Sequence, residues 1–350
     1  MHLRVLFVLV LVDPYAGSTP PNGRAFANYW NRENVCEDSL LASSVAAGTA
    51  HAYMRAVSEF LDWARAESSD DRSFRSKGLD RMLSHYFSYL CFSAESEVQR
   101  AHNSLYGVLY LMPQLKGGFP RAVRSISAFS ELRPPGERGP WDRDGIGAVC
   151  VQFLLLGRAQ CGLITLFAFA TMARAQDWRR LRISDLSFSE PDEEPRAGMI
   201  FGNHARGERT KTGFNQGFDL GPEWAFLILW LRVHVDALRA RHGDRDVRVF
   251  SISDAAFRAA WKAVARQLGF PEDPPHVLRH SGASFRVAVL QHPLAEVQRD
   301  GRWRSLSSVR RYTKTWLLQR FRSRANAASL ARGAQFWANP GRFLEAALAD

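Results

Sequence analysis

Cysteine is scarce in this chain of 350 residues, and its scarcity excludes two classes of protein. The four cysteines are Cys36, Cys91, Cys150 and Cys161. Their spacing matches no zinc-ligand pattern, so a structural metal site built on cysteine is excluded. Four cysteines are also too few for the disulfide framework of a small secreted scaffold, so we expect a reducing compartment.

Long hydrophobic runs are missing as well. The apolar stretch Leu3–Val12 is shorter than the roughly 20 residues that a membrane-spanning helix needs. It has the length of a signal-peptide core, with a poor cleavage site at Ala16–Ser18, but a buried strand or a misplaced start of the chain explains it equally well. A second stretch, Phe226–Val235, is interrupted by Arg232 and His234. We therefore expect a soluble protein without a membrane partner.

Acidic residues and lysine are both scarce relative to arginine. The 46 basic residues outnumber the 35 acidic ones, which gives a net charge of +11, and only five of the basic residues are lysines. Residues 301–350 hold ten basic and two acidic residues, so this segment alone carries a charge of +8. This balance favours a polyanionic partner, such as nucleic acid or an acidic membrane face. The planar guanidinium of arginine binds phosphate oxygens in pairs, which suits a phosphodiester partner.

Apolar residues at intervals of three and four predict a small α-helical domain in the first part of the chain. Residues 13–43 are rich in Gly, Pro, Asn and Ser, so we expect a loosely ordered leader over 1–43. The periodicity predicts four helices, at about 45–66, 78–92, 97–112 and from 120 onward. We expect this domain to cover 44–132 and to be followed by a Pro- and Gly-rich linker at 133–140.

A larger domain is predicted over 141–325, with a helical tail at 326–350 that offers an apolar surface for docking on a neighbouring subunit. Its predicted helical runs are 145–172, 174–181, 222–241, 255–268, 277–290, 293–300 and 305–324. A β-rich insert interrupts them, at 181–188, 199–202 and 209–220. The predicted fold class is therefore mainly α with one small antiparallel β-sheet.

The larger domain also contains a series of residues suited to phosphate chemistry. His276 and Arg279 are three apart, so both side chains lie on one face of a helix. Trp303 precedes Tyr312 by nine residues. The remaining members are upstream: Arg174 with Asp177 at a helix-to-strand junction, and Lys211 in the β-rich insert. Taken singly, each has a structural explanation, such as an Arg174–Asp177 pair on a helix or a packed Trp303.

The order of these residues resembles that of the tyrosine recombinases, the phage-integrase type of site-specific recombinase. In that family an Arg with an acid three residues on, a Lys in a β-hairpin, an H-x-x-R box, a His or Trp, and a Tyr nine residues later follow one another. All these positions are filled here in order. The resemblance implies a catalytic domain at 141–325, preceded by a four-helix core-binding (SAM-like) domain. It also implies a homotetramer acting on two double-stranded DNA sites, with no metal, cofactor or small-molecule substrate.

The resemblance assigns a role to each residue, and elementary chemistry agrees with the assignment. Cleavage of a phosphodiester without a metal needs an oxygen nucleophile, cationic groups around the phosphorane and a proton for the leaving oxygen. Tyr312 is the expected nucleophile, and Arg174 and Arg279 are expected to hold the non-bridging oxygens. His276 exchanges a proton with the phenol or a phosphate oxygen, and Lys211 protonates the departing 5′-oxygen.

The remaining residues near these positions have supporting roles. Trp303 offers an indole N–H to a phosphate oxygen, and Asp177 is expected to orient Arg174 or His276. We assign His280 a structural role. The basic residues that flank the tyrosine are candidate DNA contacts: Arg310, Arg311 and Lys314.

We therefore expect a DNA recombinase or integrase that works through a 3′-phosphotyrosyl intermediate, located with DNA in a nucleus or nucleoid. Two alternatives remain open. One is a catalytically silent DNA-binding protein derived from a mobile element. The other is an enzyme like the type IB topoisomerases, although the N-terminal region looks too small for the cap of the cellular enzymes.

Overall fold

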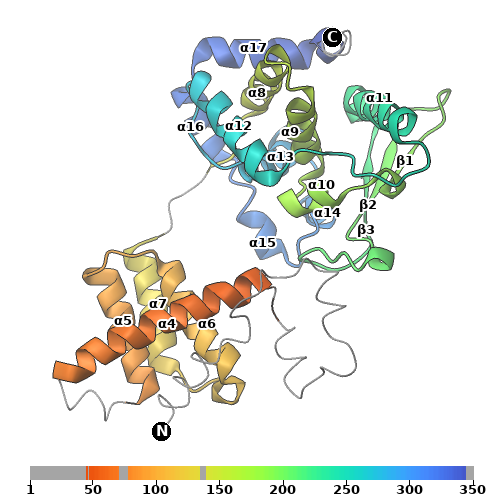
Figure 1. Ribbon diagram of the computed structural model, residues 1–350. Coiled ribbons are helices and arrows are strands. Elements are labelled where there is room, and N and C mark those ends of the chain that lie inside the picture. The colour runs from red at the N-terminus through yellow and green to blue at the C-terminus, as the bar shows by residue number, and fades with distance from the viewer. Residues whose placement is uncertain (1–44, 46, 71–77, 135–138, 344–350) are drawn as a thin grey trace. The chain divides into compact units, whose positions relative to one another are not determined.

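The computed structural model describes residues 45, 47–70, 78–134 and 139–343, which form two compact units (Figure 1). The first unit lies within Met1–Glu137 and the second within Arg138–Asp350. The expected leader over 1–43, with the apolar stretch Leu3–Val12, lies outside the described residues, as do positions 135–138 of the expected linker. None of the described helices is long and apolar enough to cross a membrane.

The described residues of the first unit form four α-helices: α4 (Ala47–Asp70), α5 (Leu79–Phe92), α6 (Val98–Leu111) and α7 (Pro120–Leu132). Their apolar stripes meet in one core that includes the fully buried Phe60, Leu83 and Val108. The start of α7 is fixed by Asp80, whose carboxylate accepts the backbone N–H groups of Arg121 and Ala122. These helices match the periodicity of the sequence closely, because each has one clear apolar face.

The second unit contains ten α-helices among the described residues. They are α8 (Arg143–Leu155), α9 (Ala159–Thr171), α10 (Ala175–Arg180), α11 (Ala225–His242), α12 (Asp254–Gln267), α13 (Val277–Ala288), α14 (Leu294–Asp300), α15 (Leu306–Arg310), α16 (Trp316–Arg324) and α17 (Ala327–Ala338). The predicted helix over 145–172 is wrong as a single element, because the chain turns between α8 and α9. Gly157 makes this turn with a φ of 64°, a backbone conformation that favours glycine.

The three strands of the second unit form an antiparallel sheet in the order β1-β2-β3. They are β1 (Leu186–Phe188), β2 (Ala197–Phe201) and β3 (Gln216–Leu220). Met199 of β2 lies opposite Leu186 on one side and Phe218 on the other, and all three are buried in the core. The predicted β-rich segment 209–220 is therefore only partly a strand, because residues 209–215 form turns before β3 begins.

The C-terminal helices show a second break that the sequence analysis missed. The predicted helix over 305–324 is divided into α15 and α16, and Tyr312 lies in the turn between them. The tail helix α17 packs along α8 of the same chain (Figure 1). Trp337 of α17 donates its indole N–H to the carbonyl of Arg143 at 2.6 Å. The fold class predicted from the sequence, mainly α with a small antiparallel sheet, is confirmed.

Candidate active site

The phenol ring of Tyr312 is held between aromatic neighbours. It stacks on the ring of His280, with centroids 4.3 Å apart, and contacts the indole of Trp303 at 5.0 Å. The backbone of the tyrosine is fixed as well, because its carbonyl accepts the hydroxyl of the buried Ser284 at 3.1 Å. His280, to which the sequence analysis gave a structural role, therefore forms part of the wall around the candidate nucleophile.

Arg279 lies at the centre of the site and is only 1% exposed. Its guanidinium donates to the backbone carbonyls of Met172 and Gly301. The guanidinium carbon is 4.1 Å from the ring centroid of Trp303 and 5.6 Å from that of Tyr312. Burial, together with the positive charges of Arg174 and Arg302, holds the pKa of Arg279 well below its ordinary value. An anion at this position would relieve that repulsion.

His276 stands at the start of the same helix, α13, and is exposed. Its Nε2 lies 3.4 Å from the hydroxyl of Tyr312. This distance is slightly longer than an ideal hydrogen bond, as is common for catalytic pairs before substrate binds. The H-x-x-R box thus places one imidazole and one buried guanidinium beside the phenol.

Arg174 and Asp177 lie at the start of α10. The carboxylate of Asp177 accepts the backbone N–H of Arg174 at 2.9 Å and the Nη2 group of Arg302 at 2.9 Å. Asp177 therefore fixes the backbone of Arg174, and its charge partner is Arg302.

Arg302 is a residue of the site that the sequence analysis missed. It has a φ of 57°, is 7% exposed, and places its guanidinium 4.2 Å from the ring centroid of Phe201. Burial lowers the pKa of Arg302 to about 10, against the opposing effect of Asp177 and with a contribution from the charge of Arg174. The only signal in the sequence is its place directly before Trp303, which says nothing about the inward direction of the side chain.

Arg174, Arg279, Arg302 and Trp303 form a cluster of donors beside Tyr312. Several buried donor atoms of this cluster have no acceptor among the described residues. They are Nη1 of Arg174, Nε of Arg279, Nε and Nη1 of Arg302, and Nε1 of Trp303. Buried polar groups in folded proteins are nearly always paired, so a concentration of unpaired cationic donors points to a bound anion. The described residues contain no group of three or more His, Cys, Asp and Glu side chains that could hold a metal ion.

The structure does not bring Lys211 into this cluster. Lys211 is exposed in the turn Thr210–Gly213, and its side chain makes no hydrogen bond or ion pair within the described residues. Of the candidate DNA contacts, Arg310 and Arg311 are exposed and Lys314 is half-buried. Arg311 donates to the hydroxyl of Ser308 at 3.2 Å.

Two solved structures of the XerH site-specific recombinase share the fold of this chain. The pre-cleavage complex of XerH with difH substrate matches with a TM-score of 0.56 and 15% identity, over 89% of this chain and 91% of that chain. The post-cleavage complex with palindromic difH substrate matches with a TM-score of 0.60 and 15% identity, over 97% and 95%. No protein-family model matches the chain, and no curated protein sequence does.

Proposed function

We propose that this chain, which has the fold of the tyrosine recombinases, cuts and rejoins DNA strands through a covalent bond between Tyr312 and a 3′-phosphate. One observation carries the proposal: buried guanidinium and indole donors that have no acceptor among the described residues gather around Arg279, beside a phenol whose hydroxyl faces a histidine. These groups fit a single backbone phosphate. The XerH structures with this fold hold a difH substrate, and the net charge of +11 supports a polyanionic substrate here too.

In the first step the hydroxyl oxygen of Tyr312 attacks the phosphorus atom. The bond between phosphorus and the 5′-oxygen breaks, and His276 accepts the phenolic proton through Nε2. Arg174 and Arg279, with Arg302 close by, compensate the negative charge that develops on the non-bridging oxygens. The guanidinium of Arg279 is held by two backbone carbonyls, so it needs no reorganisation during the reaction.

In the second step a 5′-hydroxyl from another strand attacks the phosphotyrosyl bond. The new phosphodiester forms and the phenolate leaves. The proton of the attacking hydroxyl passes to Lys211, which gave up a proton in the first step, and the proton that His276 took up returns to the phenolate. One phosphate ester replaces another, so resealing needs no external energy source. This balance favours strand exchange over simple cleavage. Lys211 would supply the proton for the departing 5′-oxygen, after the bound DNA has come within reach of its exposed turn.

The assignment of domains belongs to the same proposal. Residues 44–132 would bind DNA as a core-binding domain, and 141–325 would carry out the reaction. The tail at 326–350 would contribute to a homotetramer on two duplex sites. Arg310, Arg311 and Lys314, which flank the nucleophile, would contact phosphates of the duplex.

A nicked suicide DNA tests the proposal, because loss of a short 5′-fragment after cleavage traps the covalent intermediate. The wild-type protein is expected to form an adduct that survives denaturation, and Tyr312→Phe is expected to bind the DNA without forming it. Tyr106→Phe, which removes an exposed hydroxyl from the first unit, serves as the control and should form the adduct normally.

Three other outcomes would contradict the proposal. An adduct that persists in Tyr312→Phe rules out this nucleophile. Salt-dependent DNA binding without any adduct in the wild-type protein would indicate a catalytically silent DNA-binding protein. Relaxation of supercoiled plasmids without sequence preference would indicate an enzyme of the type IB topoisomerase class.

A further inference from the structure

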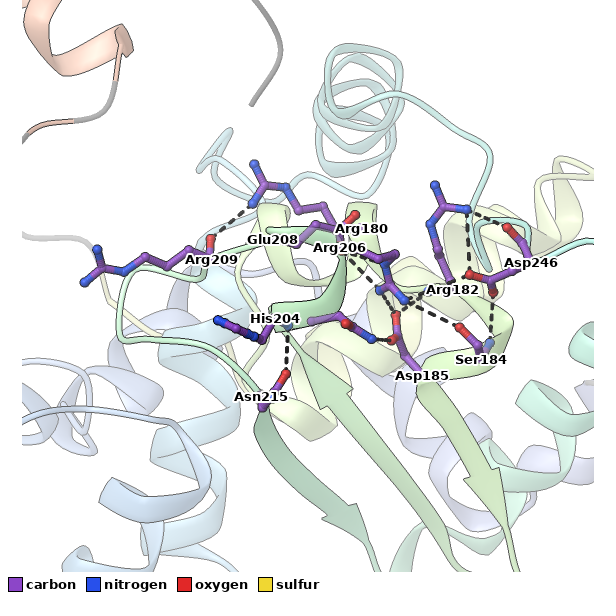
Figure 2. A network of polar contacts seen from close by, with 11 residues as sticks. Arg180, Arg182, Ser184, Asp185, His204, Arg206, Glu208, Arg209, Asn215 and Asp246 are labelled. Carbon is purple, nitrogen blue, oxygen red and sulfur yellow. Dashed lines mark hydrogen bonds and ion pairs between the residues drawn. The ribbon is translucent and has the colours of Figure 1, made fainter. Parts of the chain in front are cut away.

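The segment that connects β2 to β3, residues 202–215, carries Lys211 and is fixed by polar side chains (Figure 2). Its length allows many conformations, because only a short 3-10 turn (η5, His204–Arg206) and an isolated bridge between Thr210 and Gly213 give it regular structure. A general acid on such a segment reaches the leaving oxygen reliably only if contacts with the rest of the unit hold the backbone around it, and these contacts are called anchors below.

The first anchor is an ion cluster around Asp185, whose side chain is 2% exposed. Its carboxylate accepts the Nη2 group of Arg206 and the amide of Asn203 at 3.1 Å. Arg206, 17% exposed, also binds Glu208 at 3.1 Å. Burial acts to lower the pKa of Arg206, but its hydrogen bonds to Asp185 and Glu208 outweigh that effect and raise it. Arg206 therefore stays charged and ties residues 203–208 to the main body of the unit.

The second anchor joins the segment to the helix that starts the candidate site. Arg180, the last residue of α10, donates from Nη1 to the backbone carbonyl of Arg209 at 3.1 Å (Figure 2). Arg174 precedes the first residue at the opposite end of this six-residue helix, and Asp177 lies in its first turn. One short rigid element thus connects the phosphate-binding arginine to a point two residues before Lys211.

The turn that presents Lys211 is closed by its own hydroxyl groups. The hydroxyl of Thr210, a residue that is 6% exposed, donates to the carbonyl of Gly213 at 2.8 Å. The hydroxyl of Thr212 donates to the side-chain oxygen of Gln216 at 2.7 Å. The backbone on both sides of Lys211 is therefore defined, and the remaining freedom lies in the anchors and in the lysine side chain itself.

We propose that Arg180 and Arg206 are positioning residues that hold the Lys211 turn at a fixed place relative to Arg174 and Arg279. The inference rests on the proposed function. It specifies how Lys211, which lies outside the group of arginines beside Tyr312, is held so that it can protonate the leaving oxygen. Neither arginine touches the reacting phosphate in this account. Both act on the reaction through the place they give to Lys211.

Paired substrates separate this role from a general effect on folding or binding. One DNA has the normal 5′-oxygen at the cleaved bond, and the other has a bridging 5′-sulfur there. Cleavage of the second releases a thiolate, which leaves without being protonated. A defect in the delivery of the proton therefore slows cleavage of the first DNA only.

Arg180→Met is the main variant, because it removes one hydrogen bond from a partly exposed side chain. We expect it to form the covalent adduct about tenfold more slowly on the oxygen substrate and within about twofold of wild type on the sulfur substrate. Lys211→Ala should show the same pattern with a larger loss. Arg209→Met keeps the carbonyl that Arg180 binds and removes a positive charge from the same segment, so its two rates should change equally.

A second measurement follows the segment directly. Arg206→Met leaves the buried Asp185 without its guanidinium partner, so hydrogen exchange of the amides at 203–213 should accelerate by tenfold or more. Arg180→Met should accelerate exchange at 208–213 while the protection of α13 stays unchanged. This readout needs no DNA, so it judges the anchors even where Arg206→Met cleaves poorly.

The outcomes distinguish this inference from the proposed function. A wild-type protein that forms no adduct with either DNA overturns the proposed function and this inference with it. A wild-type protein that forms adducts, combined with an Arg180→Met variant that slows on both DNAs equally, overturns the inference alone. Unchanged amide exchange in both variants also overturns it.

Discussion

At the scale of single residues, the ion pair between Arg302 and Asp177 is a buried pair whose disruption is expected to cost much stability. The two side chains are 3% and 1% exposed, and their nearest atoms are 2.9 Å apart. Removing one partner from a buried pair leaves an uncompensated charge, which costs far more than loss of a surface pair. Arg302 also has a positive φ, so it occupies a position where most side chains are disfavoured.

We expect Asp177→Asn to lower the free energy of unfolding by about 3 kcal/mol, because Arg302 remains buried and charged. The double variant Asp177→Asn with Arg302→Met should recover part of this loss, since no isolated charge remains. Urea unfolding followed by circular dichroism measures Asp177→Asn, Arg302→Met and the double variant, and each single substitution should cost more stability than the double one.

The exposed pair Arg239–Asp236, at 3.2 Å, provides the control, and Asp236→Asn should cost at most about 0.5 kcal/mol. If the losses of stability from Asp177→Asn and Arg302→Met add up to that of the double variant within about 0.5 kcal/mol, the two side chains do not stabilise each other.

The candidate site was partly predictable from residue order alone. The sequence singled out Arg279, His276 and Tyr312, and the structure places His276 and Arg279 each beside Tyr312. Arg302 was not predictable, because its direction depends on a positive φ that no neighbouring residue signals. The sequence places Lys211 in the β-rich insert, and the structure has it between β2 and β3, but the contacts that α10 and Asp185 make with this segment were not predictable.

At the scale of elements, the sequence predicts amphipathic helices well and buried ones poorly. The helices of the first unit have one apolar face each, and their predicted limits are close to the observed ones. Most of α9 is buried on every side, so it has no periodicity that marks where it begins. The break between α15 and α16 was also missed, although it places Tyr312 in a turn beside Trp303 and His280.

The contact between α8 and α17 depends on backbones that approach each other closely. A Cβ added at Gly333 would lie 1.7 Å from the carbonyl oxygen of Asp144 and 2.8 Å from the amide nitrogen of Ala148. We expect Gly333→Ala to destabilise the second unit by roughly 1–3 kcal/mol, because neither backbone atom can move without displacing α8.

Thermal unfolding followed by tryptophan fluorescence measures this effect, since Trp337 lies on the same helix. Gly217→Ala is the matched control in the same unit, because nothing lies within 4 Å of its added Cβ. Equal unfolding midpoints for the two variants would show that α17 leaves α8 at little cost, which would make the tail available for other contacts.

At the scale of the whole molecule, positive charge is concentrated in the part of the chain that surrounds and follows the candidate nucleophile. Residues 301–350 account for +8 of the net charge of +11. Arg310 and Arg311 are exposed directly before Tyr312, so a phosphate backbone that reaches the nucleophile also passes these side chains. Charge that contacts phosphates releases counterions, and the release is measurable as salt dependence.

We expect the affinity of the protein for duplex DNA to fall by about a thousandfold between 50 and 200 mM salt if roughly six phosphates are contacted. Replacing Arg310 and Arg311 together by Gln should reduce the slope of log affinity against log salt by about 2, one unit for each lost phosphate contact.

Replacing Arg239 and Arg241 by Gln removes the same charge from the exposed end of α11 and should leave the slope unchanged. If both double variants reduce the slope equally, the DNA responds to net charge alone, and the residues beside Tyr312 do not define the path of the backbone. A smaller slope in the Arg310 and Arg311 variant alone would instead show that the duplex lies against the turn that carries Tyr312.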